Sequence, residues 1–62
     1  MTIYVFNAQT GYIARKTITE GIMYNTIERI REQFGLSNVQ PTARPNYLCY
    51  ESEKYIMEVT LN

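Results

Sequence analysis

Histidine and tryptophan are absent from this sequence, and Cys49 is its single cysteine. One copy of the chain can therefore form neither a disulfide nor the Cys and His clusters that bind structural zinc. The fold must be held by apolar packing, although a chain this short buries only about 60% of its extended surface. We expect a single domain of marginal stability over residues 1–62.

Neither sign of charge is in excess, since six basic residues balance six acidic ones. Nonspecific nucleic-acid binding normally needs a basic excess that neutralises phosphates, so a neutral chain disfavours nucleic acid as the partner. The sequence also lacks a signal-peptide pattern and an apolar run of the roughly 20 residues that span a bilayer. Because its one thiol has no disulfide partner, we expect a cytoplasmic protein that does not bind membranes.

The residues needed for enzymatic catalysis are scarce. General acid–base catalysis needs a histidine or a carboxylate pair in a cleft, and a nucleophile needs a base beside it. Without histidine, Cys49 has only Lys54 or an arginine to activate it, whereas a cysteine on a strand is usually a small inert residue. We expect no enzymatic activity, no catalytic residue, no bound metal and no cofactor.

Residues 25–35 predict an amphipathic helix. Ile27, Ile30 and Phe34 recur at spacings of three and four, which is the period of one helix face. Met23 extends this apolar stripe backwards by one turn.

Both ends of this helix carry sequence signals. Asn25 and Glu28 fit a capping box, and Thr19 offers an earlier cap, so the start of the helix has two candidates. Gly35 suits the left-handed conformation that ends a helix, and Leu36 can then fold back onto the last turn.

The segment before the helix predicts a β-hairpin. Residues 2–6 and 12–19 are rich in β-formers, and a turn joins them. A four-residue loop pairs Val5 with Ala14, whereas a one-residue bulge would shift this register.

A loop and a second hairpin are predicted after the helix. Residues 37–46 contain both prolines and no periodicity, which is typical of a loop. The segment that follows predicts a hairpin about Ser52 and Glu53, with Tyr50 opposite Tyr55.

These elements predict an α+β fold of order ββαββ, in which a four-stranded sheet packs one face against one helix. The helix and the sheet face that it covers should supply the core. The predicted core residues are Ile3, Val5, Ala14, Ile18, Met23, Ile27, Ile30, Phe34, Leu48, Met57, Val59 and Leu61.

The order of elements, with the first and last strands adjacent, resembles the β-grasp arrangement. In length and element order the chain resembles the immunoglobulin-binding domains of bacterial protein G, through MTIYVFN at the start, TITEG before the helix and YLCYESEKYIMEVT at the end. The amino-terminal half also resembles ubiquitin, in MTIYVF, the TG of the turn and the TIE that opens the helix. The resemblance implies a fold alone. The helix residues that bind antibodies in the protein G family are not recognisable here, so it implies no antibody binding.

One helix covers only one face of such a sheet, and the other face is predicted to be apolar. Tyrosine is common at interfaces because it combines a large contact area with a polar tip. A contiguous patch of this kind is typical of a partner site or a dimer seam, unless Arg15, Lys54 and Glu58 lie over it. The apolar residues expected on this face are Tyr4, Phe6, Ile13, Tyr47, Cys49 and Ile56.

We therefore expect a small non-catalytic protein-binding module, an inhibitor that covers a surface of another protein or protein complex. In size and simplicity the chain resembles the small inhibitors encoded by phages, such as anti-CRISPR proteins. The acidic residues of the last hairpin would then imitate phosphates locally. The residues expected to bind the partner are Tyr4, Phe6, Ile13, Tyr47, Ile56, Glu51, Glu53 and Glu58.

Two other functions remain open. A nucleic-acid-binding module would use a basic and aromatic surface, with Arg15, Lys16, Arg29, Arg31, Tyr4, Tyr12 and Tyr47. A self-associating structural module would use the apolar face as the seam of a homodimer. The exposed edges of the sheet add a second mode of docking, which is strand addition.

Overall fold

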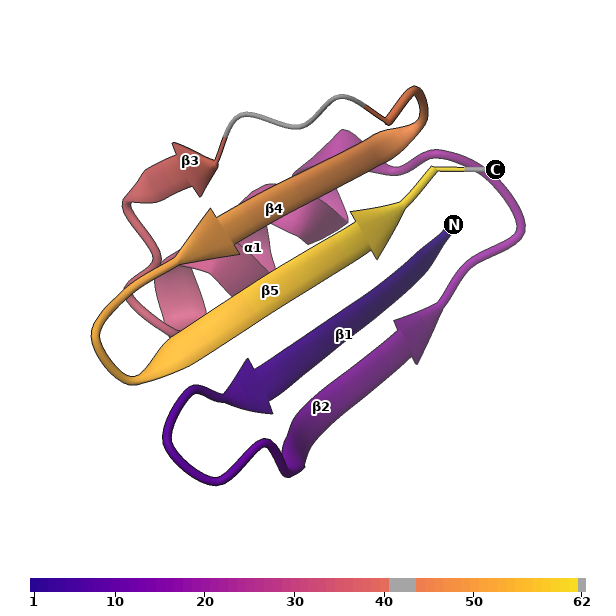
Figure 1. The fold of residues 1–62 in the computed structure, drawn as a ribbon. Helices are drawn as coiled ribbons and strands as arrows, with labels where there is room; N and C mark the ends of the chain where they lie inside the picture. The colour runs from indigo at the N-terminus through magenta and orange to yellow at the C-terminus, as the bar shows by residue number, and fades with distance from the viewer. Residues whose placement is uncertain (41–43, 62) are drawn as a thin grey trace.

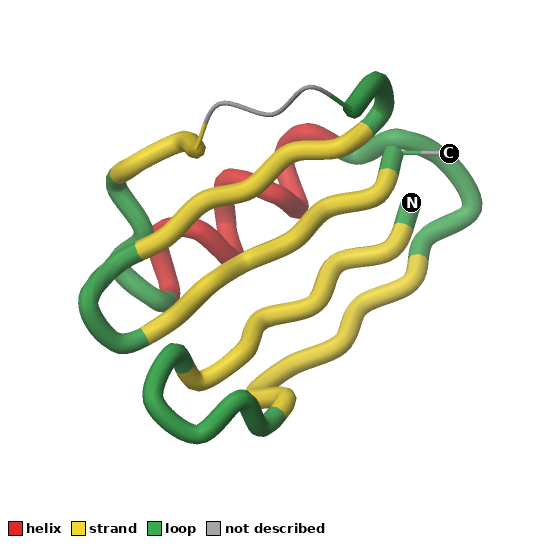
Figure 2. Tube along the Cα trace, viewed as in Figure 1, coloured by secondary structure: helices red, strands yellow, loops and turns green. Residues whose placement is uncertain are grey.

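A computed structural model describes residues 1–40 and 44–61 of the chain. One antiparallel sheet packs against one helix, which lies behind the sheet in Figures 1 and 2. The strands occur in the spatial order β2-β1-β5-β4-β3. The elements are β1 (Thr2–Asn7), β2 (Ile13–Ile18), α1 (Tyr24–Gln33), β3 (Asn38–Gln40), β4 (Tyr47–Glu51) and β5 (Tyr55–Thr60). The predicted α+β class and the ββαββ order are confirmed.

The sheet contains one short strand more than predicted. Asn38–Gln40 pairs with β4, so the prediction of a loop over residues 37–46 is wrong for these three residues. Residues 41–43 of that loop lie outside the described residues. The first and last strands are adjacent, as the resemblance implies, but they run antiparallel. The two central strands of a β-grasp sheet run parallel, so the resemblance extends to element order and not to strand direction.

A β-bulge in the first hairpin changes which residues of β2 face the helix. The ladder shifts between Val5 and Phe6, so that Val5 lies opposite Arg15 and not opposite Ala14. A shift of one residue turns side chains to the other face of the sheet, because they alternate along a strand. Ala14 and Ile18 are consequently exposed, and their prediction as core residues is wrong.

The second hairpin shifts by two residues and keeps its predicted faces. Tyr50 pairs with Met57 and not with Tyr55, and the turn centres on Glu53 and Lys54. The Ser52 backbone amide closes this turn by donating to the Tyr55 carbonyl at 2.9 Å. A shift by two leaves each side chain on its original face, so the predicted inward residues of β4 and β5 still face the helix.

The helix begins one residue earlier than predicted and has no capping box. Its N-cap is Met23, and no side chain caps it by a hydrogen bond. Asn25 lies inside the helix, and the Thr19 hydroxyl donates to the Gly21 carbonyl at 2.5 Å, so both predicted caps are wrong. Met23 itself is half exposed and does not belong to the core.

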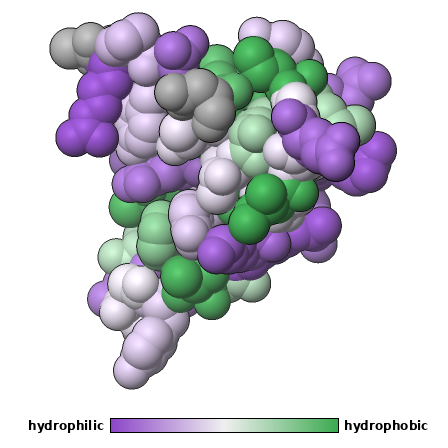
Figure 3. All heavy atoms as spheres, turned by 90° about the vertical axis from the view of Figure 1, so that its right-hand side faces the viewer, coloured by the Kyte–Doolittle hydropathy of each residue, from purple (hydrophilic) through white to green (hydrophobic). Residues whose placement is uncertain are grey.

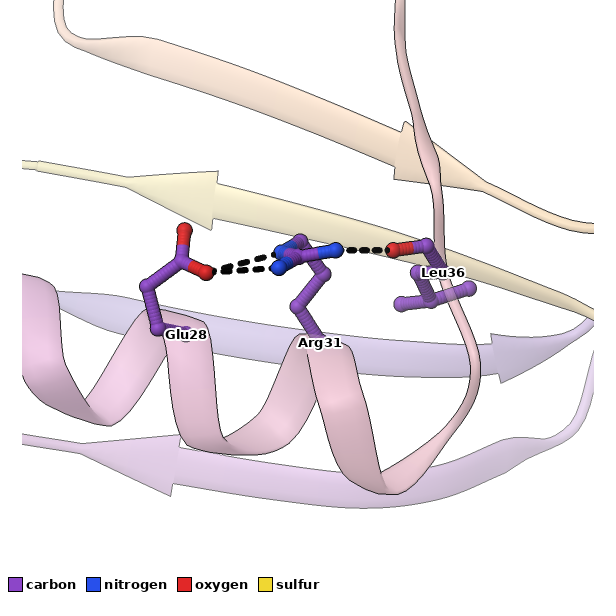
Figure 4. Close-up of polar contacts among 3 residues, drawn as sticks. All are labelled: Glu28, Arg31 and Leu36. Atoms are coloured by element: carbon purple, nitrogen blue, oxygen red, sulfur yellow. Dashed lines mark hydrogen bonds and ion pairs between the residues drawn. The ribbon is translucent and has the colours of Figure 1, made fainter.

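The end of the helix is as predicted. Gly35 has φ of +68°, and its amide donates to the Glu32 carbonyl at 3.2 Å. The Leu36 amide donates to the Arg31 carbonyl at 2.9 Å, which completes a Schellman motif and folds Leu36 into the core. The Arg31 guanidinium reinforces the turn, since it donates to the Leu36 carbonyl at 2.9 Å and to the Glu28 carboxylate at 2.8 and 3.0 Å (Figure 4).

Apolar side chains from α1 and the three central strands form the core. Phe34 also packs edge-to-face on Tyr55, with ring centroids 4.9 Å apart, and so joins the end of α1 to the start of β5. Met1, Leu36 and Tyr50 are buried without having been predicted. The predicted core residues that are buried are Ile3, Val5, Ile27, Ile30, Met57 and Val59, and those that pack partly buried against them are Phe34, Leu48 and Leu61.

The core assignment is tested by truncating two isoleucines that the sequence pattern treated alike. Ile30 is 1% exposed, whereas Ile18 is 67% exposed. Truncating Ile30 to Ala should lower the free energy of unfolding by about 2–5 kcal/mol, because it leaves a cavity. Truncating Ile18 to Ala should change it by less than about 0.5 kcal/mol. Urea unfolding followed by circular dichroism measures both values, and equal losses would contradict the assignment.

Candidate functional site

The sheet face opposite α1, here the outer face, is built from three rows of side chains. Residues paired across neighbouring strands share a face, so the register determines each row. The middle row contains Lys16, Tyr4, Glu58 and Cys49. On one side of it lies the row of Ile13, Phe6, Ile56 and Glu51, and on the other side the row of Ile18, Thr2, Thr60 and Tyr47.

The outer face brings together most of the residues predicted to bind a partner. Its apolar members are the six predicted ones, Tyr4, Phe6, Ile13, Tyr47, Cys49 and Ile56. Glu51 and Glu58 lie among them, whereas Glu53 is exposed in the turn between β4 and β5. Four neighbouring strands therefore contribute to one surface that mixes aromatic, aliphatic and acidic side chains.

Contacts within the outer face hold its aromatic side chains in place. The rings of Tyr4 and Phe6 stack with centroids 5.7 Å apart and an angle of 18° between their planes. The Lys16 ammonium lies 5.4 Å from the centroid of the Tyr4 ring, and the Arg44 guanidinium lies 5.5 Å from that of Tyr47. These three aromatic residues are half-buried, and the two cations cover part of the Tyr4 and Tyr47 rings.

Of the long neighbours that the sequence suggested, Glu58 lies on this face and Arg15 does not. Lys16 and Arg44 lie over the rings, whereas Arg15 lies on the helix side of the sheet because of the bulge. There its guanidinium donates to the side-chain oxygen of Gln33 in α1 at 2.6 Å.

Burial and the charge of Glu58 together raise the pKa values of two groups on the outer face near β4. Burial raises the pKa of the Cys49 thiol above its ordinary value, and the charges of Glu58 and Glu51 raise it further. The pKa of Tyr47 is raised in the same way, by burial first and then by Glu58. Cys49 therefore remains a protonated thiol near neutral pH, which is a poor nucleophile.

Comparison with known proteins adds nothing to this geometry. No protein-family model, no curated protein and no solved structure matches the chain. Within residues 1–40 and 44–61, no group of three or more His, Cys, Asp or Glu side chains is arranged to hold a metal ion. No helix in the same part of the chain is long and apolar enough to cross a membrane. The function must be argued from the surface itself.

Two depressions interrupt the surface away from the outer face. One of about 300 Å³ lies between the end of α1 and the second hairpin turn, and is lined by Phe34, Gly35, Ser52, Glu53, Lys54 and Tyr55. The other, of about 420 Å³, is lined by Ile22, Met23, Tyr24 and Asn25, where α1 begins. The depression where α1 begins is bordered by exposed apolar side chains, so it is part of a larger exposed apolar surface.

The sequence pattern missed this larger feature, which is the exposed apolar surface along β2 and its connection to α1. Among the described residues, the large hydrophobic side chains that are most exposed all lie between residues 12 and 24. Figure 3 shows the end of the molecule that holds this connection, where hydrophobic side chains reach the surface between hydrophilic ones. The residues are Tyr12, Ile13, Ile18, Ile22, Met23 and Tyr24. The bulge hides Ile18, which strict alternation along residues 12–19 turns inward, and Met23 was predicted as part of the core stripe of the helix.

The role of Glu58 is tested by the reactivity of the thiol. Replacing Glu58 with Gln removes a negative charge that raises the pKa of Cys49. The pKa should fall, the thiolate fraction at pH 8 should rise, and alkylation by iodoacetamide should be faster than in the wild type. Glu53→Gln is the matched control, and it should react at the wild-type rate. An unchanged or slower rate in Glu58→Gln would show that Glu58 does not act on the thiol.

Proposed function

We propose that this protein is a small non-catalytic protein-binding module that inhibits a partner by covering one of its surfaces. The observation that carries the proposal is the outer face, where tyrosine, phenylalanine and isoleucine from four neighbouring strands lie together on the side that α1 does not cover. Tyrosine is enriched among the few residues that supply most of the binding energy in protein interfaces. The single thiol favours a reducing compartment such as the cytoplasm.

The size of the molecule suits this role. Its two longest dimensions are 29 and 23 Å. A face of that extent approaches the area of about 800 Å² per partner that a standard interface buries. The protein would therefore bind with most of one side, and its bulk would exclude other ligands from the surface that it covers.

The acidic side chains indicate what kind of surface is covered. Glu51 and Glu58 lie beside the aromatic side chains, and Glu53 lies at the turn that ends the same hairpin. Carboxylates placed in this way imitate the phosphates of a nucleic acid, so the proposed target is a protein with a nucleic-acid site. Inhibitors of the anti-CRISPR kind act on targets of this class.

A nucleic-acid-binding module is the competing function, and the contact of Lys16 with Tyr4 favours it, because stacked aromatic side chains with a cation suit an exposed base. Two features disfavour it. Glu51 and Glu58 repel phosphates from the same face, and Arg31 is already held by Glu28 on the helix. A gel-shift titration at two salt concentrations separates the two functions, since phosphate contacts weaken steeply as salt rises.

The outer face is tested with two matched tyrosine truncations. Tyr4 lies on the outer face, whereas Tyr24 is exposed at the start of α1. After affinity capture identifies the partner, Tyr4→Ala should weaken its binding by about 1–3 kcal/mol, or roughly 5- to 150-fold in Kd. Tyr24→Ala should bind as the wild type does. Calorimetry with the purified partner measures both, and an unchanged Kd for Tyr4→Ala would count against the outer face.

Local imitation of phosphates is tested by reversing charge. Replacing Glu51, Glu53 and Glu58 with Lys should abolish inhibition of the target if these carboxylates occupy a phosphate site. Reversing Glu20 and Glu32, which are exposed elsewhere, should leave inhibition intact. Full inhibition by the triple variant would rule out phosphate imitation while leaving the apolar contact as the mode of binding.

A further inference from the structure

We propose that the open edge of β2 binds an extended acidic segment of a partner protein by strand addition. This inference rests on the backbone and charges of β2 and not on the aromatic side chains of the outer face. It adds a second contact to the proposed function, and either can hold without the other.

The backbone of β2 presents hydrogen-bonding groups along its outer side. β2 is the last strand of the sheet and pairs only with β1 among the described strands. The Met1 ammonium donates to the Thr19 carbonyl at 3.0 Å, and the Thr19 amide donates to the Met1 carbonyl at 2.9 Å. Bonded and non-bonded pairs alternate along an antiparallel ladder, so Lys16 and Ile18 direct their amides and carbonyls away from the sheet.

The side chains of β2 are also accessible on both faces. Every residue of the strand except Thr17 is exposed, and Figure 1 shows α1 behind the half of the sheet that contains β4 and β5. Ile13 and Ile18 are 55% and 67% exposed. β2 carries the charges and the bulge that protect natural edge strands, but it also exposes two isoleucines, which protection alone does not require.

The charges of β2 select the occupant. Arg15 and Lys16 are the charged residues between Tyr12 and Thr19, and because side chains alternate along a strand, one lies on each face of the edge. A second copy paired edge to edge would bring two arginines and two lysines together, which is repulsive. The same cations attract a strand that carries carboxylates. The partner is therefore an acidic segment of another protein and not a copy of this chain.

The register predicts the pattern of this segment. A strand antiparallel to β2 places an apolar side chain opposite Ile18 and, two residues later, an acidic one opposite Lys16 on the same face. The following residue lies opposite Arg15 on the helix side, where a second carboxylate fits. The expected pattern is apolar, any residue, acidic, acidic.

The test measures binding of two labelled synthetic peptides to the full chain by fluorescence polarisation. Acetyl-TVTEEVT-amide carries the expected pattern, and acetyl-TVTKKVT-amide reverses its charge. The acidic peptide should bind saturably and more weakly at high salt, and the basic peptide should not bind. Equal binding of the two peptides, or no binding of the acidic one, would overturn the proposal.

Two variants at one position separate the charge of β2 from its backbone. Lys16→Ala removes the ammonium and keeps the outward amide, whereas Lys16→Pro removes both. Proline is tolerated on an edge strand where the amide faces solvent, so both variants should fold. Lys16→Pro should bind the acidic peptide about fivefold more weakly than Lys16→Ala, which is the loss of one net hydrogen bond. Equal affinities would show that the backbone of β2 makes no contact.

Amide chemical shifts of the wild type provide a check that needs no variant. The acidic peptide should shift the amides of Lys16 and Ile18 more than those of β4, and the reverse order would overturn the proposal. A dimer of the chain that light scattering detects in the wild type and that Lys16→Pro abolishes would overturn it as well. Ile56→Ala, on the outer face, should keep its affinity for the peptide while it loses affinity for the partner, so this inference and the proposed function can fail separately.

Discussion

The packing of Ile27 and Ile30 against the inner face of the sheet is the interaction on which the rest of the structure depends. These two side chains, each 1% exposed, meet Ile3, Val5 and Met57, which are fully buried. No disulfide is available to a chain with one cysteine, so this layer must offset the conformational entropy of folding. A single ten-residue helix has only one apolar stripe, and this stripe covers only the inner face of the sheet. The partly exposed apolar side chains of the outer face follow directly from this limit.

A single inserted residue in β2 then determines the character of the sheet edge. The bulge beside Val5 and Phe6 turns Lys16 to the outer face and Arg15 to the helix side. It also moves Ile18 out of the core and onto the surface. The edge strand consequently combines exposed isoleucines with cations on both faces. Two surfaces of different chemistry result, namely an aromatic and acidic outer face and a basic edge.

The sequence predicted the features that depend on periodicity and failed where local geometry breaks it. The stripe of Ile27, Ile30 and Phe34, the stop at Gly35 and the six apolar residues expected on the outer face were predictable from spacing, whereas the places of Lys16 and Ile18 on that face were not. The second hairpin tolerated a register error of two residues, because faces repeat every second residue. The bulge could not be located, since the register without a bulge places Ala14 and Ile18 inward and so fits the apolar pattern better than the observed register, which places Arg15 and Thr17 inward. The capping box failed because the chain enters α1 one residue before Asn25. Met1 lies before the first strand, so no alternation along that strand pointed to its burial.

The central claim is that the outer face remains accessible in the free protein and is covered by a partner in the complex. The relaxation of isoleucine methyl signals by a soluble paramagnetic agent tests this claim most directly. Isoleucines lie in the core, on the outer face and in the connection before α1, so each region has its own signal. In the free protein the methyl signals of Ile3 and Ile30 should be protected, and those of Ile56 and Ile22 should be broadened. With the partner bound, Ile56 should become protected while Ile22 stays broadened. A complex in which Ile56 remains as accessible as in the free protein would contradict the account.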